Sequence, residues 1–300
     1  MNLKSKTIMS SERYSFDVGS FECIVINDGT FSYPRPSQNV FINFFVNAPE
    51  DRLRRVLRDH NLVPEHWEEY VSPYICLVIS KGHEHVLVDT GAGSMAPTTG
   101  RLIPNLEAEG ISPEDIDTVI LTHGHPDHIG GNIDSEGRPA FPNAKYVMWK
   151  DEWDFWTSDP DLSGLKMDDH GKEILVKVAQ NNLHPIRDQL ELIEREVEIR
   201  PGISAVSAPG HTPGHMAVEL VSDNARLLHI SDTVLHPIHV EQPGWCSSVA
   251  FDPEKVTVSR LRLFNKVASE EAQVIATHFP FPGLGYIIQK GEGWQWRALP

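Results

Sequence analysis

Three histidines and one aspartate stand within six consecutive positions, in the segment HGHPDH at 123–128. The segment follows DTVILT, a nearly continuous apolar run that predicts a buried strand. A tight turn with glycine and proline can direct His123 and His125 toward one point, and Asp127 and His128 toward a second point nearby. Because gathering these side chains is costly without a cation between them, the segment predicts a metal site.

Three more candidate ligands stand at the ends of other apparent strands. His211 lies in the turn APGHTPGH, Asp232 ends the strand LLHIS, and His278 ends the strand QVIAT. Imidazole and carboxylate together suit zinc, and Mn, Fe, Co or Ni would also suit such a set. Seven ligands are too many for one tetrahedral ion. They therefore predict two divalent ions, zinc first among them, with one carboxylate shared.

The elements that must position these residues are strands and helices that alternate along the chain. Strands are predicted at FDVG, FECIVIND, YICLVIS and HVLVDTG before the HGHPDH segment, and at ISAVSAPG, HMAVELV and ARLLHIS after it. Helices are predicted to start at 47–50 and to cover 101–109, 171–182, 185–195 and 253–268. Hairpin-like strands with helices outside them predict an α+β chain with mixed sheets.

Length and charge narrow the domain count and the partners. The 300 residues contain no repeat and no low-complexity linker, so we expect a single domain over 1–300. An extra N-terminal segment is expected at about 35–75 and an insertion at about 150–200. A net charge of −16 repels phosphate backbones and anionic lipid, which argues against nucleic acid as a substrate. No apolar run reaches the roughly 18 residues of a membrane span, so no membrane role is expected.

The N-terminus and the cysteines favour a cytoplasmic location. The first residues lack the apolar core of a secretory signal. The three cysteines, Cys23, Cys76 and Cys246, cannot all pair within one chain, and their spacing forms no zinc motif. We therefore expect buried, reduced thiols.

The segment HGHPDH resembles the HxHxDH signature of the metallo-β-lactamase-like hydrolase superfamily. Further motifs stand in that family's order: DTG at 89–91, GHTPGH at 210–215, SDT at 231–233 and TH at 277–278. The resemblance implies a four-layer αβ/βα sandwich, the metallo-β-lactamase fold, with a dinuclear site at one edge. It covers most of the chain, and five ordered motifs make it specific.

The resemblance also assigns roles to the candidate residues. It implies one ion held by His123, His125 and His211, a second held by Asp127, His128 and His278, and Asp232 as the bridge. Asp89 and Thr122 would lie behind the ligands and hold the histidine-rich loop.

The chemistry implied by the resemblance is metal-assisted hydrolysis, with Asp127 and Asp232 as the catalytic carboxylates. Two ions can share a bridging hydroxide that attacks the substrate, while Asp127 or an ion steadies the leaving group. Histidine at 125 differs from the glutamate of the diiron flavoprotein branch, so redox chemistry is disfavoured.

Within the superfamily, the sequence is most similar to the branch of N-acyl-homoserine lactonases and methyl parathion hydrolase. Only 22 residues follow His278, too few for the glutathione-binding extension of glyoxalase II, and the acidic charge opposes the RNase Z-like branches. True β-lactamases of this superfamily generally lack an aspartate at the position of Asp232, which argues against that activity. The tail HFPFPGLG is similar to that of methyl parathion hydrolase, and Leu235 stands where lactonases often place a tyrosine.

These features favour hydrolysis of an uncharged ester-type bond in a small apolar molecule: a lactone, an aryl ester or a phosphotriester. The alternatives are a β-lactamase-type or other thioester or amide hydrolase, and a catalytically silent metal-containing binding protein. His236 and His239 follow Asp232 closely, and a place near the site and a place as solvated loop residues explain them equally well. His215 is interpreted as the start of a strand. The extra N-terminal segment can pack on a second copy, so a homodimer is expected. The candidate residues for an apolar substrate pocket are Phe44, Phe45, Trp67, Trp153, Phe155, Trp156, Leu235, Trp245, Phe279 and Phe281.

Overall fold

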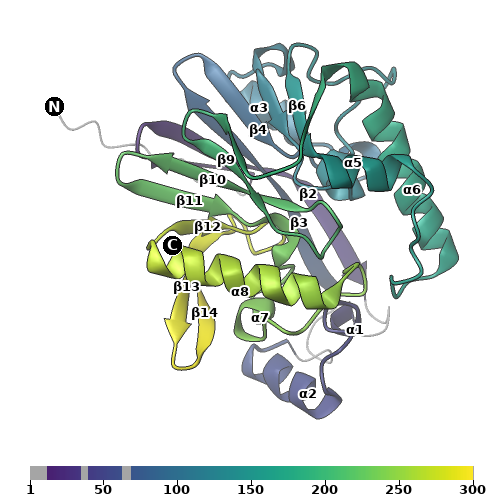
Figure 1. Ribbon diagram of the computed structural model, residues 1–300, viewed down its shortest axis with the longest axis vertical. Helices are drawn as coiled ribbons and strands as arrows, with labels where there is room; N and C mark the ends of the chain where they lie inside the picture. Colours follow the sequence, from purple (N-terminus) through teal and green to yellow (C-terminus); the bar gives the residue numbers. More distant parts are fainter. Residues whose placement is uncertain (1–11, 35–39, 63–68, 300) are drawn as a thin grey trace.

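Two seven-stranded mixed sheets form the centre of the computed structural model, which describes residues 12–34, 40–62 and 69–299 (Figure 1). The first sheet follows the chain order and consists of β1 (Arg13–Val18), β2 (Phe21–Pro34), β3 (Glu69–Lys81), β4 (Glu84–Val88), β5 (Thr118–Ile120), β6 (Lys145–Trp149) and β7 (Leu190–Ile193). The second sheet consists, from one edge to the other, of β14 (Gly293–Ala298), β13 (Leu284–Lys290), β12 (Gln273–Ile275), β11 (Ala225–His229), β10 (Met216–Ser222), β9 (Ile203–Ser207) and β8 (Val197–Arg200).

Alternating side chains build one core between the sheets and another outside each sheet. In β3, Ile75 and Leu77 point into the core between the sheets, while Cys76 and Val78 point into the core on the outer face. Because neighbouring residues of a strand face opposite sides, a strand that is covered on both faces needs an unbroken apolar run. The sequence predicts YICLVIS as a strand and DTVILT as a buried strand, and both predictions are confirmed.

Helices cover the outer face of each sheet and complete four layers. The first sheet is covered by α3 (Leu102–Ala108), α5 (Lys150–Thr157) and α6 (Asp169–Leu183), and the second by α8 (Pro253–Ser269) (Figure 1). In α8, Leu263, Phe264 and Val267 face the sheet at helical spacing, and the side chain of Asp252 caps the first turn by accepting from the N–H of Lys255. The predicted four-layer α+β sandwich is confirmed.

A separate aromatic cluster lies beside the sandwich. It joins α1 (Val40–Phe44) and α2 (Glu50–Asp59) to α7 (Ile238–Glu241) and the loop that follows it. The cluster packs Phe41, Phe44 and Phe45 against Leu235 and Trp245. The predicted residue Trp67 lies outside the described residues. In Figure 1, α1 and α2 lie at the end of the molecule beyond α7.

The remaining short helices lie in connections between strands. They are η2 (Gly93–Met95), η3 (Pro113–Asp115), α4 (Pro126–Ile129), η4 (His184–Gln189) and η5 (Ser231–Thr233). The helix predicted at 185–195 is wrong, because η4 ends at Gln189 and the chain continues as β7, which pairs with β6. Within the described residues, no helix is long and apolar enough to span a membrane.

Candidate metal centre

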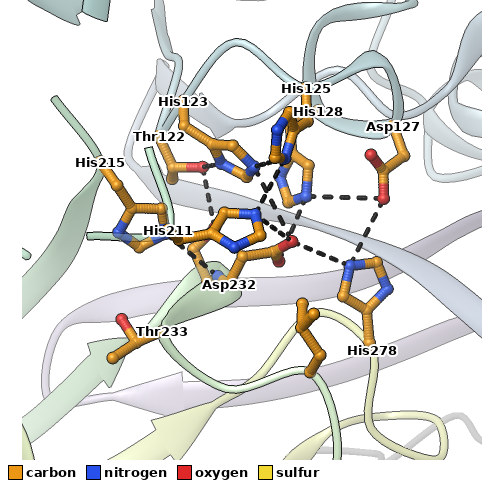
Figure 2. Close-up of polar contacts among 12 residues, drawn as sticks. Thr122, His123, His125, Asp127, His128, His211, His215, Asp232, Thr233 and His278 are labelled. Atoms are coloured by element: carbon orange, nitrogen blue, oxygen red, sulfur yellow. Dashed lines mark hydrogen bonds and ion pairs between the residues drawn. The ribbon is translucent and has the colours of Figure 1, made fainter. Parts of the chain in front are cut away.

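All the predicted ligands lie in loops at one edge of the two sheets. The parallel pairing of β4 with β5, and of β11 with β12, places the carboxyl ends of these strands at that edge. The loop after β5 carries the HGHPDH segment, and the loop after β9 carries His211. Asp232 lies in η5 after β11, and His278 follows β12. Figure 2 shows the seven side chains converging from these loops.

The seven side chains divide into two groups that share one aspartate. The His211 group consists of His123, His125, His211 and Asp232, and the His278 group consists of Asp127, His128, Asp232 and His278. In each group the four candidate donor atoms lie within 4.8 Å of one another. This division matches the two ligand sets that the resemblance implies.

Distances within the His211 group match the spacing of tetrahedral ligands. His125 Nδ1 lies 3.1 Å from His123 Nε2 and 2.9 Å from His211 Nε2. Asp232 Oδ2 lies 3.2 Å from His211 Nε2 and 3.8 Å from His123 Nε2. Donor atoms bound at about 2.1 Å to one tetrahedral ion lie about 3.4 Å apart. The group can therefore hold one divalent ion.

The His278 group has similar spacing and a second carboxylate. His278 Nε2 lies 3.4 Å from Asp127 Oδ2 and 3.2 Å from Asp232 Oδ2. His128 Nε2 lies 3.7 Å from Asp127 Oδ2 and 3.2 Å from Asp232 Oδ1. His128 Nε2 and Asp232 Oδ1 are buried, and neither has a hydrogen bond beyond the 3.2 Å contact between them. Since orphaned buried polar atoms are costly, these two atoms fit the coordination of an ion.

Residues behind the ligands fix which imidazole nitrogen keeps its lone pair. His128 Nδ1–H donates to Asp89 Oδ2 at 2.7 Å, so Nε2 is left facing the site. His278 Nδ1–H donates to the carbonyl of Pro73 at 3.1 Å with the same result. His123 Nδ1 lies 3.1 Å from Thr122 Oγ1, which itself donates to Asp89 at 2.8 Å. Asp89 and Thr122 therefore lie where they were predicted, behind the histidine-rich loop.

Two residues with left-handed backbone mark the turns that aim the ligands. Asp89 has φ of 61° and Ser231, directly before Asp232, has φ of 44°. Such conformations are uncommon for residues other than glycine and cluster at functional sites. Ser231 Oγ lies 2.9 Å from Thr122 Oγ1, which joins the turns of the two sheets.

The charges of the cluster are strongly coupled. Burial, with neighbouring imidazoles, lowers the pKa of His123 and of His125, so both favour the neutral form that binds metal. Burial alone would lower the pKa of His128, but Asp232, Asp89 and Asp127 outweigh it and hold the pKa well above its ordinary value. Burial would raise the pKa of Asp232, but His278 and His128 hold it far below its ordinary value.

His215 supports the shared aspartate without joining either group. It directly precedes β10, as predicted, and its Nδ1–H donates to the carbonyl of Ala208 at 3.0 Å. Its Nε2 accepts from the backbone N–H of Asp232 at 3.1 Å. Burial lowers the pKa of His215 to about 3, so the ring stays neutral and can accept this bond. The second histidine of GHTPGH gave no sequence signal for this role.

Glu152 is a buried carboxylate beside the site that the sequence did not single out. It lies in the first turn of α5 and is fully buried. Its oxygens accept from the backbone N–H groups of Gly124 and Gly214, both at 2.8 Å, and from Trp156 Nε1 at 2.6 Å. A glutamate followed by tryptophans at i+1 and i+4 was the available signal.

A pocket opens beside the two groups. Among the described residues that line it, His125, Asp127, Asp232 and His278 belong to the cluster. Asp127 is the most exposed of these ligands, with 17% of its side chain accessible. The rest of the lining is formed by Tyr33, Asn43, Phe44, Ser72, Tyr74, Pro126, Leu175, Leu235, Ser247, Ser248 and Val249.

Most of the predicted aromatic pocket residues lie elsewhere. Phe44 and Leu235 are in the lining, whereas Phe45 and Trp245 lie behind them in the aromatic cluster. Phe279 packs against Trp296 in the core under α8. Phe281 lies against the core between the sheets. The other three, Trp153, Phe155 and Trp156, lie in α5. Of these three, Trp156 packs against the ring of His125, with 5.6 Å between ring centroids.

The interpretation of two further histidines as solvated is wrong. His239 is buried, donates from Nε2 to the carbonyl of Phe44 at 2.9 Å, and accepts the N–H of Leu235 at Nδ1. His236 is buried among aromatic rings, with Phe45 5.7 Å away between centroids. The aromatic cluster covers this loop, which sequence periodicity does not reveal.

Known proteins resemble this chain in sequence and in fold. The model of the metallo-beta-lactamase superfamily matches residues 72–291. The N-acyl homoserine lactonase AiiA of Bacillus thuringiensis subsp. kurstaki is 23% identical over 225 residues, which cover 68% of this chain and 79% of the relative. The structure of AidC, a dizinc quorum-quenching lactonase, matches 96% of this chain and 98% of its own with a TM-score of 0.87 and 27% identity. The hydrolase AbOPH matches 98% and 99%, with a TM-score of 0.85 and 25% identity.

Proposed function

The chain belongs to the metallo-beta-lactamase superfamily, and from this premise we propose that it is a dinuclear hydrolase of uncharged ester-type bonds in small apolar molecules. Lactones, aryl esters and phosphotriesters are the candidate substrates. We propose zinc for both ions, because imidazole and carboxylate donors at tetrahedral spacing suit it. The same set also accepts Mn, Fe, Co or Ni.

The observation that carries the substrate class is the charge of the pocket. Beside the ligand groups, its described lining contains neither lysine nor arginine. An anionic substrate would meet only the cluster itself, on a chain with a net charge of −16. The neutral hydroxyls of Ser72, Ser247 and Ser248 and the apolar side chains of Leu175 and Leu235 suit an uncharged molecule with an apolar part.

The ligand groups would supply the reactive chemistry. When two divalent ions are bound, they lower the pKa of water and polarise the attacked carbonyl or phosphoryl bond. Asp127 and Asp232 both belong to a ligand group and line the pocket, and Asp127 is the more exposed of the two. We infer that Asp127 holds the proton that the leaving oxygen needs. Figure 2 shows one Asp127 oxygen in the contacts of the cluster and the other outside them.

Two tyrosines supply hydrogen-bond donors to the same pocket. Burial, with the charges of Asp127 and Asp232, raises the pKa of Tyr33 to about 12 and also raises the pKa of Tyr74. Both phenols therefore stay protonated at neutral pH and can donate to a substrate oxygen. We infer that they orient the carbonyl or the leaving group, since Leu235 offers no donor there.

The test is a parallel rate assay on protein of measured metal content. The substrates are an acyl-homoserine lactone, a simple δ-lactone, an aryl acetate, a dialkyl aryl phosphate and nitrocefin. We expect kcat/KM to be highest for one of the first four. A preference for nitrocefin would contradict the proposal, and a metal-loaded protein without turnover would favour a binding role.

Three further predictions are kept as proposals. We propose one domain over 1–300, with extra segments at about 35–75 and 150–200. We propose a homodimer, which sedimentation velocity would test. We also propose a cytoplasmic location, with which the three free, buried cysteines are compatible.

A further inference from the structure

Glu152 is a fully buried carboxylate whose partners all lie at the metal centre. Burial raises its pKa, while the Thr212 hydroxyl and hydrogen bonds from Gly124, Trp156 and Gly214 oppose this effect. Among the described residues it forms no ion pair. Three N–H donors therefore satisfy a buried acceptor that has no cationic partner, an arrangement that suits the ionised carboxylate.

The two backbone partners of Glu152 belong to different ligand loops. Gly124 stands between His123 and His125, and Gly214 lies in the loop that carries His211. Oε1 binds the first loop and Oε2 binds the second, each at 2.8 Å. One carboxylate thus joins the loops that provide all three imidazoles of the His211 group.

The close approach of α5 to both loops depends on these glycines. A Cβ at Gly124 would lie 2.3 Å from the ring of Trp156, and a Cβ at Gly214 would lie 2.4 Å from the backbone nitrogen of Glu152. Neither contact is possible without a shift of the chain. The chain therefore has glycine at both positions where α5 touches a ligand loop.

We propose that Glu152 is a positioning residue that fixes the spacing of His123 and His125 relative to His211, so that the His211 group is formed before an ion binds. The proposal rests on the metal centre of the proposed function. It assigns the main effect of Glu152 to the His211 group, because its carboxylate bonds Gly124, which stands between His123 and His125, and Gly214 in the His211 loop. Asp127 and His128 stand further along the first loop, and His278 lies in a loop that the described hydrogen bonds of Glu152 do not reach.

The substitution Glu152→Gln tests this assignment. Glutamine has nearly the same shape but replaces one acceptor oxygen with an NH₂ donor, which must then face an N–H group. The matched control is Asp151→Asn, which removes a carboxylate from the same helical turn at an exposed position. Each change is made in two backgrounds: His278→Ala, which leaves all four residues of the His211 group, and His211→Ala, which leaves all four residues of the His278 group.

The readout is titration of the metal-free protein with Co²⁺, followed by its visible spectrum. In the His278→Ala background, Glu152→Gln should weaken Co²⁺ binding about tenfold or more and alter the spectrum, as expected for a residue that orients ligands. In the His211→Ala background the affinity should change by less than about threefold, because the ligands of the His278 group stand at least three residues from the contact at Gly124 or in other loops. Asp151→Asn should change neither.

Unchanged Co²⁺ affinity and spectrum in the His278→Ala background would overturn the proposal, even if the metal-free protein unfolded at a lower temperature. If Glu152→Gln does not fold, Glu152→Asp replaces it, because aspartate keeps the charge but is too short to reach both loops. An intermediate loss of affinity is then expected, and no loss would again overturn the proposal. Failure of the His278→Ala protein itself to bind Co²⁺ would instead contradict the metal centre.

Discussion

The two ligand groups share Asp232 but differ in charge and in exposure. The His211 group has three imidazoles and one carboxylate, whereas the His278 group has two of each. The His211 group is buried throughout, while Asp127 of the His278 group faces the pocket. An ion in the His278 group would thus be held by more negative charge in a more open place.

The supports of the two groups differ in the same way. His128 of the His278 group donates a hydrogen bond to the carboxylate of Asp89. The His211 group depends on packing and on backbone contacts, through Glu152 and the glycines that it joins. The His211 group is therefore stabilised mainly by geometry, and the His278 group mainly by charge.

The largest effect is expected at the residue that the groups share. Asp232→Ala removes a ligand from both groups and leaves buried imidazoles without their counter-charge. Loss of the metal chemistry corresponds to several kcal/mol of transition-state stabilisation, or about 10³-fold or more in kcat/KM. Metal analysis should show loss of both ions. His278→Ala should lose one ion, and equal stoichiometry in the two variants would refute a shared aspartate.

Removing the metals should lower stability. An ion at a thousand times its dissociation constant adds about 4 kcal/mol to the free energy of unfolding. Without ions, His128 Nε2 and Asp232 Oδ1 are buried with no hydrogen bond beyond their contact with each other. Calorimetry before and after dialysis against a chelator measures the difference, and restored Zn²⁺ should reverse it. An unchanged melting temperature would contradict a structural contribution from the ions.

Asp89→Asn should weaken metal binding by about 10- to 100-fold, as expected for a group that orients ligands. The loss should be larger for the His278 group, because Asp89 contacts His128 directly and the His211 group only through Thr122. Thr122→Val is the matched comparison, and its loss should fall mainly on the His211 group. Competition with a chelator would give the metal affinity of each group in each variant. If both variants weakened the two groups equally, the two groups would not differ in their supports.

The ligand groups could be predicted from sequence because each of the four segments that carry them starts within four residues of the end of an apolar strand. The strand ends at Ile120 and Ile275 fix where His123 and His278 start their turns. Parallel pairing then gathers such turns at one edge. The local sequence pattern and the strand pairing therefore indicate the same positions for the ligand groups, and these positions depend little on packing between distant segments.

The pocket walls could not be predicted in this way. Large aromatic residues are buried wherever a core needs them, so Phe279 and Trp245 gave the same signal as Phe44. Tyr33 and Ser72 reach the pocket from β2 and β3, and nothing in their local sequence shows it. The helix predicted at 185–195 failed for a related reason, since pairing with β6 outweighs the local apolar spacing.

Tyr74→Phe should lower kcat/KM about three- to tenfold, because one hydrogen bond to the substrate is lost. The ring of Tyr74 packs against His278 with 5.6 Å between centroids, and phenylalanine preserves this contact. Metal content should therefore not change. Tyr286→Phe, on β13 and outside the pocket lining, is the control. A loss of metal in Tyr74→Phe would mean that the phenol supports the His278 group rather than the substrate.

A change in substrate preference rather than in overall rate is expected at Leu235, whose apolar side chain lines the pocket. Leu235→Tyr adds a donor and bulk, and should raise the ratio of lactone to phosphotriester kcat/KM about three- to tenfold, the range of one added hydrogen bond. Leu235→Phe adds the bulk without the hydroxyl. If both variants raise the ratio equally, pocket width sets the preference. If only tyrosine does, the leaving oxygen uses the donor. An unchanged ratio in both would mean that substrate selection lies with the open, charged His278 group rather than with the pocket wall.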